Sequence, residues 1–155
     1  MFESLENTAV AIWVGESLWG YPMLLGLHVV GLAIVVGIFV MRDLRLLGLF
    51  DGISYESLER LRRLGWTGFV INAISGCFLF SSQAVHFSTS TPFLLKISMI
   101  FLAAIAAAVI QNRMHAGAAG WDRAGRVPGT VRGLAVLSIL LWTGAIVAGR
   151  LTAYL

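Results

Sequence analysis

Four long apolar runs, separated by polar segments, divide the chain. They cover about residues 21–41, 64–84, 93–110 and 134–155. Each run has about 18 to 22 residues, enough for an α-helix to cross the ~30 Å hydrocarbon core of a bilayer. Because the segments between the runs are short, each helix should pack on its sequence neighbours. The pattern predicts an all-α fold, a four-helix transmembrane bundle with up-down-up-down topology, in which residues 1–155 form one integral membrane domain.

Two shorter segments outside these runs also have helical spacing. Residues 2–17 mix bulky apolar side chains with acidic and amide ones, which predicts an amphipathic interfacial helix on the membrane surface, ended by Gly20 and Pro22. A frayed tail is the alternative. Residues 51–63 predict a short helix that extends the second span, with Ser54 as its N-cap. The N-terminal segment lacks the basic residues of a signal peptide, so we expect it to be retained.

The composition agrees with a membrane protein. Of the 155 residues, 58% are apolar and only 12% are charged, against about 25% charged in a typical soluble domain. Mean hydropathy is +0.85. These values exclude a disordered chain and argue against a water-soluble domain. The single cysteine, Cys77, excludes a disulfide framework and a cysteine-based zinc site.

The basic residues predict the orientation in the membrane. Nine of the eleven lie after the first and third runs, at Arg42, Arg45, Arg60, Arg62, Arg63, Arg113, Arg123, Arg126 and Arg132. The positive-inside rule places these segments in the cytoplasm. We therefore expect a multi-pass protein of the bacterial inner membrane with both termini periplasmic. The clustering in two loops does not suggest binding to nucleic acid.

Three ionisable residues, His28, Lys96 and Arg150, fall inside the apolar runs and need a reason for being there. On the expected topology all three lie in the outer half of the membrane, and His86 lies at the same surface. Histidine is a competent axial ligand for haem iron, and cations suit the carboxylates of haem. The pattern predicts a haem b site, with His28 and His86 as metal ligands and Lys96 and Arg150 as partners of the propionates.

This site predicts a small b-type cytochrome-like protein that passes electrons between the quinone pool and a partner. Gly65, Gly68, Asn72 and Gly76 share one face of the second span, which would leave room for a flat macrocycle or allow close helix packing. Other interpretations stay open for each residue of the site. Lys96 and Arg150 could reach the headgroups, His86 could be a surface residue, and His28 could satisfy a hydrogen bond between helices. His28 should also lie deeper than His86.

Two other function classes are compatible with the sequence. One is a non-catalytic accessory or scaffold subunit of a larger membrane complex or homo-oligomer. The other is a copper-handling protein, in which Met23 and Met99 would lie near His28. The sequence contains no phosphate-binding glycine loop, no paired catalytic carboxylates and no Ser–His–Asp set. No catalytic residue is therefore predicted, and enzymatic activity is left open. His115 is expected to be solvated at the cytoplasmic end of the third span.

Several segments resemble an uncharacterised family of small four-helix bacterial membrane proteins. They are LHVVGLAIVVGIFVMRDLRLLG at 27–48, RRLGWTGFVINAISGCFLF at 62–80, PFLLK at 92–96 and AGRLTAYL at 148–155. More distantly, His28 and the PFLLK segment are similar to copper-resistance D-like membrane domains and to haem-binding protoporphyrinogen oxidases of the HemJ type. In the HemJ-type pattern only His28 and Lys96 match. This resemblance implies a bundle able to hold haem.

Overall fold

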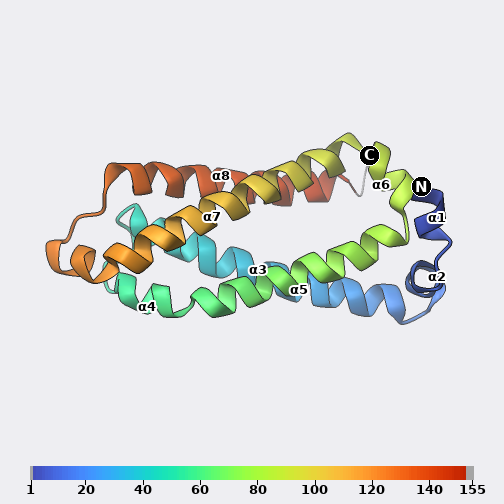
Figure 1. Cartoon of the computed structure of the whole chain (residues 1–155), viewed down its shortest axis with the longest axis horizontal. Helices are drawn as coiled ribbons and strands as arrows, with labels where there is room; N and C mark the ends of the chain where they lie inside the picture. Colours follow the sequence, from blue (N-terminus) through green and yellow to red (C-terminus); the bar gives the residue numbers. More distant parts are fainter. Residues whose placement is uncertain (1, 153–155) are drawn as a thin grey trace.

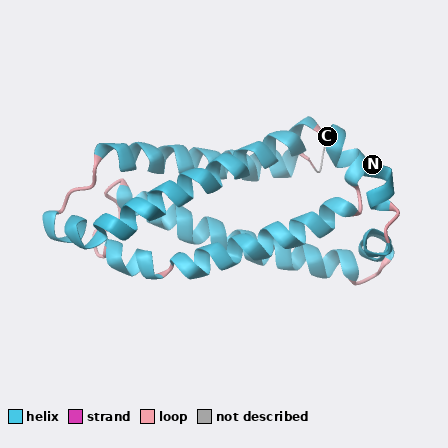
Figure 2. Cartoon of the chain, viewed as in Figure 1, coloured by secondary structure: helices cyan, strands magenta, loops and turns pink. Residues whose placement is uncertain are grey.

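The computed structural model describes residues 2–152 as a bundle of long helices, with no strand in that range (Figures 1 and 2). Four stretches are long and apolar enough to cross a membrane: α3 (Gly20–Leu46), α4 with α5 (Tyr55–Ser81), α7 (Thr91–Ala124) and α8 (Gly129–Leu151). The all-α four-helix bundle predicted from the sequence is thus confirmed. Residues 153–155 of the fourth apolar run lie outside the described residues.

Short helices close the two ends of the bundle. We call the end that holds α1 (Phe2–Glu6), α2 (Ala9–Glu16) and α6 (Ala84–Thr89) the outer end (Figure 1). The opposite end, which holds α4 (Tyr55–Arg60) and the turn at 125–128, is the inner end. These names follow the orientation expected from the arginines.

The N-terminal segment differs from the single helix expected at 2–17. It forms two helices because Thr8 caps the second one, with its side chain accepting a hydrogen bond from the Ala11 amide at 3.3 Å. Gly20 and Pro22 do not end this segment, since both lie in the first turn of α3. Proline is tolerated there because the first amides of a helix have no partner within it.

The spans also differ in length from the apolar runs. α7 has 34 residues and continues well beyond the expected end at 110. It stops only at Gly125, which takes the left-handed conformation with φ of 62°. α8 begins at Gly129, directly after Pro128, rather than at 134. α5 (Arg62–Ser81) is a helix separate from α4, and the N-cap expected at Ser54 is confirmed by its bond from the Ser57 amide.

The bundle consists of two helical hairpins joined along one seam. α3 packs along α5, α7 packs along α8, and the two pairs meet where α3 lies against α8. Consecutive helices were expected to pack throughout, but α5 and α7 hardly touch within the described residues. They lie on opposite sides of the view in Figure 1 over the outer half of the bundle. One side of the bundle between the hairpins is therefore closed less tightly than the others.

Glycines bring the backbones of α3 and α5 into direct contact. A Cβ atom at Gly31 would lie 2.8 Å from the Asn72 amide nitrogen and 3.0 Å from the Gly68 carbonyl oxygen. At Gly68 the added atom would lie 2.6 Å from the Ile34 side chain, and at Gly65 it would lie 2.8 Å from Phe39. The glycine face of α5 therefore packs on α3 and leaves no gap there for a macrocycle.

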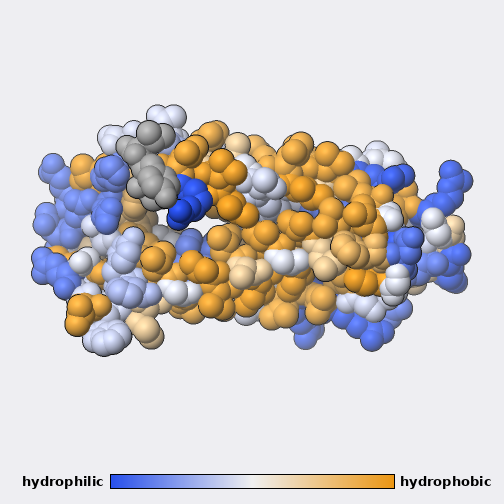
Figure 3. Space-filling view, turned by 180° about the vertical axis from the view of Figure 1, so that it is seen from behind, coloured by the Kyte–Doolittle hydropathy of each residue, from blue (hydrophilic) through white to orange (hydrophobic). Residues whose placement is uncertain are grey.

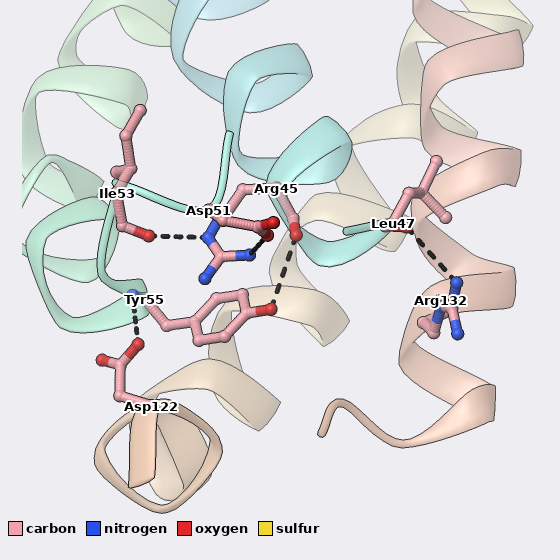
Figure 4. A network of polar contacts seen from close by, with 7 residues as sticks. All are labelled: Arg45, Leu47, Asp51, Ile53, Tyr55, Asp122 and Arg132. Atoms are coloured by element: carbon pink, nitrogen blue, oxygen red, sulfur yellow. Dashed lines mark hydrogen bonds and ion pairs between the residues drawn. The ribbon is translucent and has the colours of Figure 1, made fainter. Parts of the chain in front are cut away.

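At the inner end, polar contacts tie the loop after α3 to the second hairpin (Figure 4). Arg45 donates to the Ile53 carbonyl at 2.6 Å and to the Asp51 carboxylate at 3.1 Å, and its guanidinium lies over the Tyr55 ring. Asp122 of α7 accepts from the Tyr55 amide at 2.9 Å, which caps the N-terminus of α4 from another helix. These contacts hold the short helix α4 against α7.

The surface has the pattern of a protein that spans a membrane. A broad apolar belt covers the middle of the molecule, and hydrophilic residues gather at its two ends (Figure 3). Many large apolar side chains are exposed in this belt, among them Val30, Ile74, Phe101 and Leu140. Contact with lipid explains this exposure, whereas contact with water would be unfavourable. The chain is a multi-pass membrane protein.

Candidate functional site

The His28 ring lies between the two helices of the first hairpin. His28 is eight residues into α3, about 12 Å from its first residue at 1.5 Å per residue. Its Nδ1 atom lies 2.9 Å from the Asn72 carbonyl oxygen and 3.2 Å from the Ser75 hydroxyl. A carbonyl oxygen only accepts, so the Nδ1–H donates to Asn72 and the lone pair is on Nε2.

Asn72 fixes this histidine from both sides of the helix contact. Its side-chain amide donates to the His28 carbonyl oxygen at 2.9 Å, while its own carbonyl accepts from the His28 ring. Gly76, one turn further along α5, makes room for the ring, because a Cβ there would lie 3.1 Å from His28 Cε1. The ring therefore has a set position, and hydrogen-bonded rings of this kind often bind a metal through Nε2. The Asn72 side-chain nitrogen lies 3.4 Å from Nε2, so a metal there would replace that contact.

Lys96 approaches the same region from the second hairpin. Its side chain is half-buried, and its ammonium lies 5.0 Å from the centre of the Phe93 ring. The stem passes over Gly149 of α8, where an added Cβ would lie 3.1 Å from Lys96 Cδ. Lys96 and His28 are close enough to interact electrostatically. Two of the residues selected from the sequence thus lie in the same region, one on each hairpin.

Arg150 and His86 are more exposed than this pair. Arg150 follows Gly149 on α8, so its backbone is at the level of Lys96. His86 is on α6, exposed, with its ring 5.5 Å from that of Phe87. No hydrogen bond or ring contact joins His86 to His28 within residues 2–152. The structure places His28 and Lys96 in one region without a direct contact that joins them among the described residues, has Arg150 at the level of Lys96, and leaves His86 on the outer surface.

The molecule is hollowed between its two hairpins near the outer end. Figure 3 shows this opening beside the α7–α8 hairpin, next to strongly hydrophilic atoms. It lies on the side where α5 and α7 hardly touch. Because the glycine face of α5 is filled by α3, this opening is the remaining space between the hairpins at the outer end.

Aromatic rings gather at the outer end, and sequence reasoning did not find this group. Phe80, Phe87 and Phe93 stack with centroid separations of 5.0 to 6.4 Å, and Phe2 meets Phe80 edge-on. The group joins α1, α5, α6 and α7 beside Lys96. In the sequence, these four phenylalanines share only their position at the outer end of a segment. Their spacing along the chain follows no fixed pattern by which the group could be recognised.

The remaining candidates lie elsewhere or carry no ligand set. His115 is exposed within α7 rather than at its end, 3.2 Å from Glu59 at the inner end. Met99 packs its sulfur on Gly144, and Met23 is largely exposed. Across residues 2–152 no three or more His, Cys, Asp or Glu side chains form a group suited to a metal ion. A haem ligand requires no such group, because it can be a single histidine.

Comparisons with known proteins add no assignment. No family model, curated protein or solved structure matches the chain. The family resemblance drawn from the sequence therefore stays a prediction, and function has to be argued from the site.

Proposed function

We propose that the protein binds haem b near its outer end and takes part in electron transfer, with His28 as the axial ligand. One observation carries the proposal, namely the 2.9 Å contact between His28 Nδ1 and the Asn72 carbonyl oxygen. This bond uses the Nδ1 proton, keeps the lone pair on Nε2 and holds the ring in place. A carbonyl oxygen that accepts a hydrogen bond from one ring nitrogen orients a histidine that binds a metal through the other, and it raises the basicity of the ring.

The charges near His28 support the same ligand. Haem carries two propionates, which need cations when they are removed from water. Lys96, half-buried and close to His28, would hold one of them, and Arg150 at the same level of α8 would hold the other. Bound haem would supply reversible one-electron chemistry, and the protein would supply its position and its potential. The quinone pool is the partner we expect.

The second axial position has less support. His86 lies on the outer surface against Phe87 and makes no contact with His28. The described residues therefore present one histidine to the interior, and our proposal retains His86 only as a ligand to be tested by substitution.

Absorbance spectroscopy of the detergent-purified protein tests the proposal. Oxidised protein should show a Soret band, and reduction with dithionite should sharpen the α and β bands. His28→Ala should abolish these bands, whereas His115→Ala, at the inner end, should retain them. Retention of the bands in His28→Ala would contradict the assignment. Unchanged band positions in His86→Ala would remove His86 from the ligand set.

A flat visible spectrum from folded protein, expressed with sufficient haem, would overturn the cytochrome proposal. Copurification with other chains would then support the accessory-subunit alternative, and metal analysis would test the copper alternative. Folding is checked independently by the helical content in far-UV circular dichroism.

A further inference from the structure

A second polar site lies in the inner half of the bundle, far from His28. It is made by five side chains of α3, α7 and α8, which we call the polar layer: Arg42, Asp43, Gln111, Ser138 and Trp142. None is more than 5% exposed, and Asp43 and Ser138 are fully buried. Arg42 follows His28 by fourteen residues, about 21 Å along α3. The polar layer is therefore separate from the proposed haem site.

Apolar side chains enclose the polar layer on both sides. Towards the outer end lies the cluster of Val35, Phe39, Ala103, Ala107 and the ring of Trp142. Towards the inner end lies the cluster that contains Leu46, Ile110, Met114, Val131 and Ala135. Polar groups between two apolar clusters within a membrane bundle cannot exchange freely with bulk water. Their hydrogen bonds have to be made inside the layer.

The contacts within the layer satisfy only part of its polar atoms. Arg42 donates to the Asp43 carboxylate through Nε at 2.8 Å and to the Ala107 carbonyl at 3.3 Å. The Trp142 ring lies 5.9 Å from that of Phe39. Arg42 Nη2 lies 2.7 Å from Asp43 Oδ1 in the ion pair. Four other buried atoms of the layer have no hydrogen-bond partner within the described residues: Asp43 Oδ2, Gln111 Nε2, Ser138 Oγ and Trp142 Nε1.

Buried polar atoms without a hydrogen-bond partner lower the stability of a fold. A buried donor or acceptor without a partner loses its hydrogen bond to water and gains none in return, and the layer holds several in one place. Native structures usually resolve such groups with ordered water. The chemistry of the four atoms therefore indicates which ligand the layer takes.

The four atoms match a molecule that both donates and accepts. Gln111 and Trp142 offer N–H donors, Asp43 Oδ2 is an acceptor, and the Ser138 hydroxyl can do either. A cation would face two N–H groups. An anion would face the Asp43 carboxylate, whose charge Arg42 already balances. Water can accept from Gln111 or Trp142 and donate to Asp43. We propose that the polar layer is an internal water-binding site.

The inner end offers the route by which water reaches this site. A basin of about 370 Å³ opens there, lined by Leu46, Tyr55, Val127, Arg126, Arg132 and three glycines. Leu46 follows Asp43 by three residues, so it lies one helical turn away, and it is 1% exposed. It also belongs to the apolar cluster that closes the layer. Leu46 is thus the barrier between the basin and the polar layer.

Water next to the Trp142 indole can be detected directly by nuclear magnetic resonance. In detergent-solubilised protein labelled with ¹⁵N-tryptophan, the Trp142 indole signal is assigned from its contacts with the Phe39 ring and from its loss in Trp142→Phe. We expect a through-space cross-peak from this proton to water, with the sign of a long-lived bound molecule. The peak should persist in Ser138→Ala, which excludes relay through the serine hydroxyl.

The barrier is tested by the exchange of the same indole proton with solvent. Leu46→Ala should accelerate it by at least about tenfold, equivalent to about 1.4 kcal/mol in opening free energy. Leu44→Ala, a half-buried leucine on the same helix that does not line the basin, is the matched control and should change it little. A resolved Trp142 indole signal without any water cross-peak would overturn the site. Equal acceleration by the two leucine variants would overturn the route.

Discussion

Substitution of Gly31 by alanine should destabilise the packing of α3 on α5. It should also break the hydrogen bonds between His28 and Asn72. The added Cβ would lie 2.8 Å from the Asn72 amide nitrogen and 3.0 Å from the Gly68 carbonyl oxygen. Both neighbours are backbone atoms, which cannot turn aside as a flexible side chain could. Ordinary contact needs about 3.5 Å, so α3 and α5 must separate by about 0.7 Å at this level.

That separation has a definite energetic consequence. The bonds from His28 Nδ1 to the Asn72 carbonyl and from the Asn72 amide to the His28 carbonyl are both 2.9 Å long. Lengthened by about 0.7 Å, both fall outside hydrogen-bond range. Two bonds at about 1 kcal/mol each, with about 1–3 kcal/mol of overpacking, outweigh the gain of up to about 1 kcal/mol from replacing a helical glycine. We expect a net loss of about 2–4 kcal/mol.

Equilibrium unfolding in mixed detergent micelles, followed by far-UV circular dichroism, measures this loss. Gly37→Ala is the matched control, because it lies on the same helix and an added Cβ there meets nothing within 4 Å. It should be neutral or stabilising by up to about 1 kcal/mol. If Gly31→Ala unfolds at the same denaturant activity as Gly37→Ala, the reasoning about backbone contact between α3 and α5 is wrong.

Two further predictions concern the inner half of the molecule. Asp122→Ala removes the cap of α4, so the Tyr55 amide should exchange with deuterium faster and the free energy of unfolding should fall by about 1 kcal/mol. Asp51→Ala, which removes a largely exposed ion-pair partner, should change neither the exchange rate nor the free energy of unfolding. Arg42→Met leaves Asp43 buried without its cation and should cost about 3–5 kcal/mol in the same unfolding assay. Adding Asp43→Leu should recover part of that loss, and a further loss would refute the ion-pair argument.

The four spans could be predicted from the sequence because hydropathy over about 20 residues directly reflects the requirement for a spanning helix. The residues at which the helices begin and end could not be predicted in this way. α7 extends to Ala124 because no proline or left-handed residue interrupts it before Gly125, although its apolar run ends near Ile110. The break at Thr8 depends on a side-chain cap, which competes with continuing the helix and leaves hydropathy unchanged.

The candidate site could be predicted only in part. Depth along each span placed His28 and Lys96 at one level, because helices rise by a constant 1.5 Å per residue, and the structure brings them close together. The sequence did not show which helix faces which. The bond between His28 and Asn72, 44 residues apart, depends on the rotation of α5 about its axis. For the same reason the polar layer was not predicted.

Because Arg42 and Asp43 are adjacent in the chain and pair with one another, α3 brings its own counter-charge into the bilayer. During synthesis α3 and α5 emerge from the ribosome well before α8, which supplies Ser138 and Trp142. An unpaired charge on α3 would then remain in the lipid until the helix with its partner had been synthesised, at a cost of several kcal/mol. The local pair removes this delay, so the buried part of α3 can be inserted without an uncompensated charge, and the second hairpin can pack on it later.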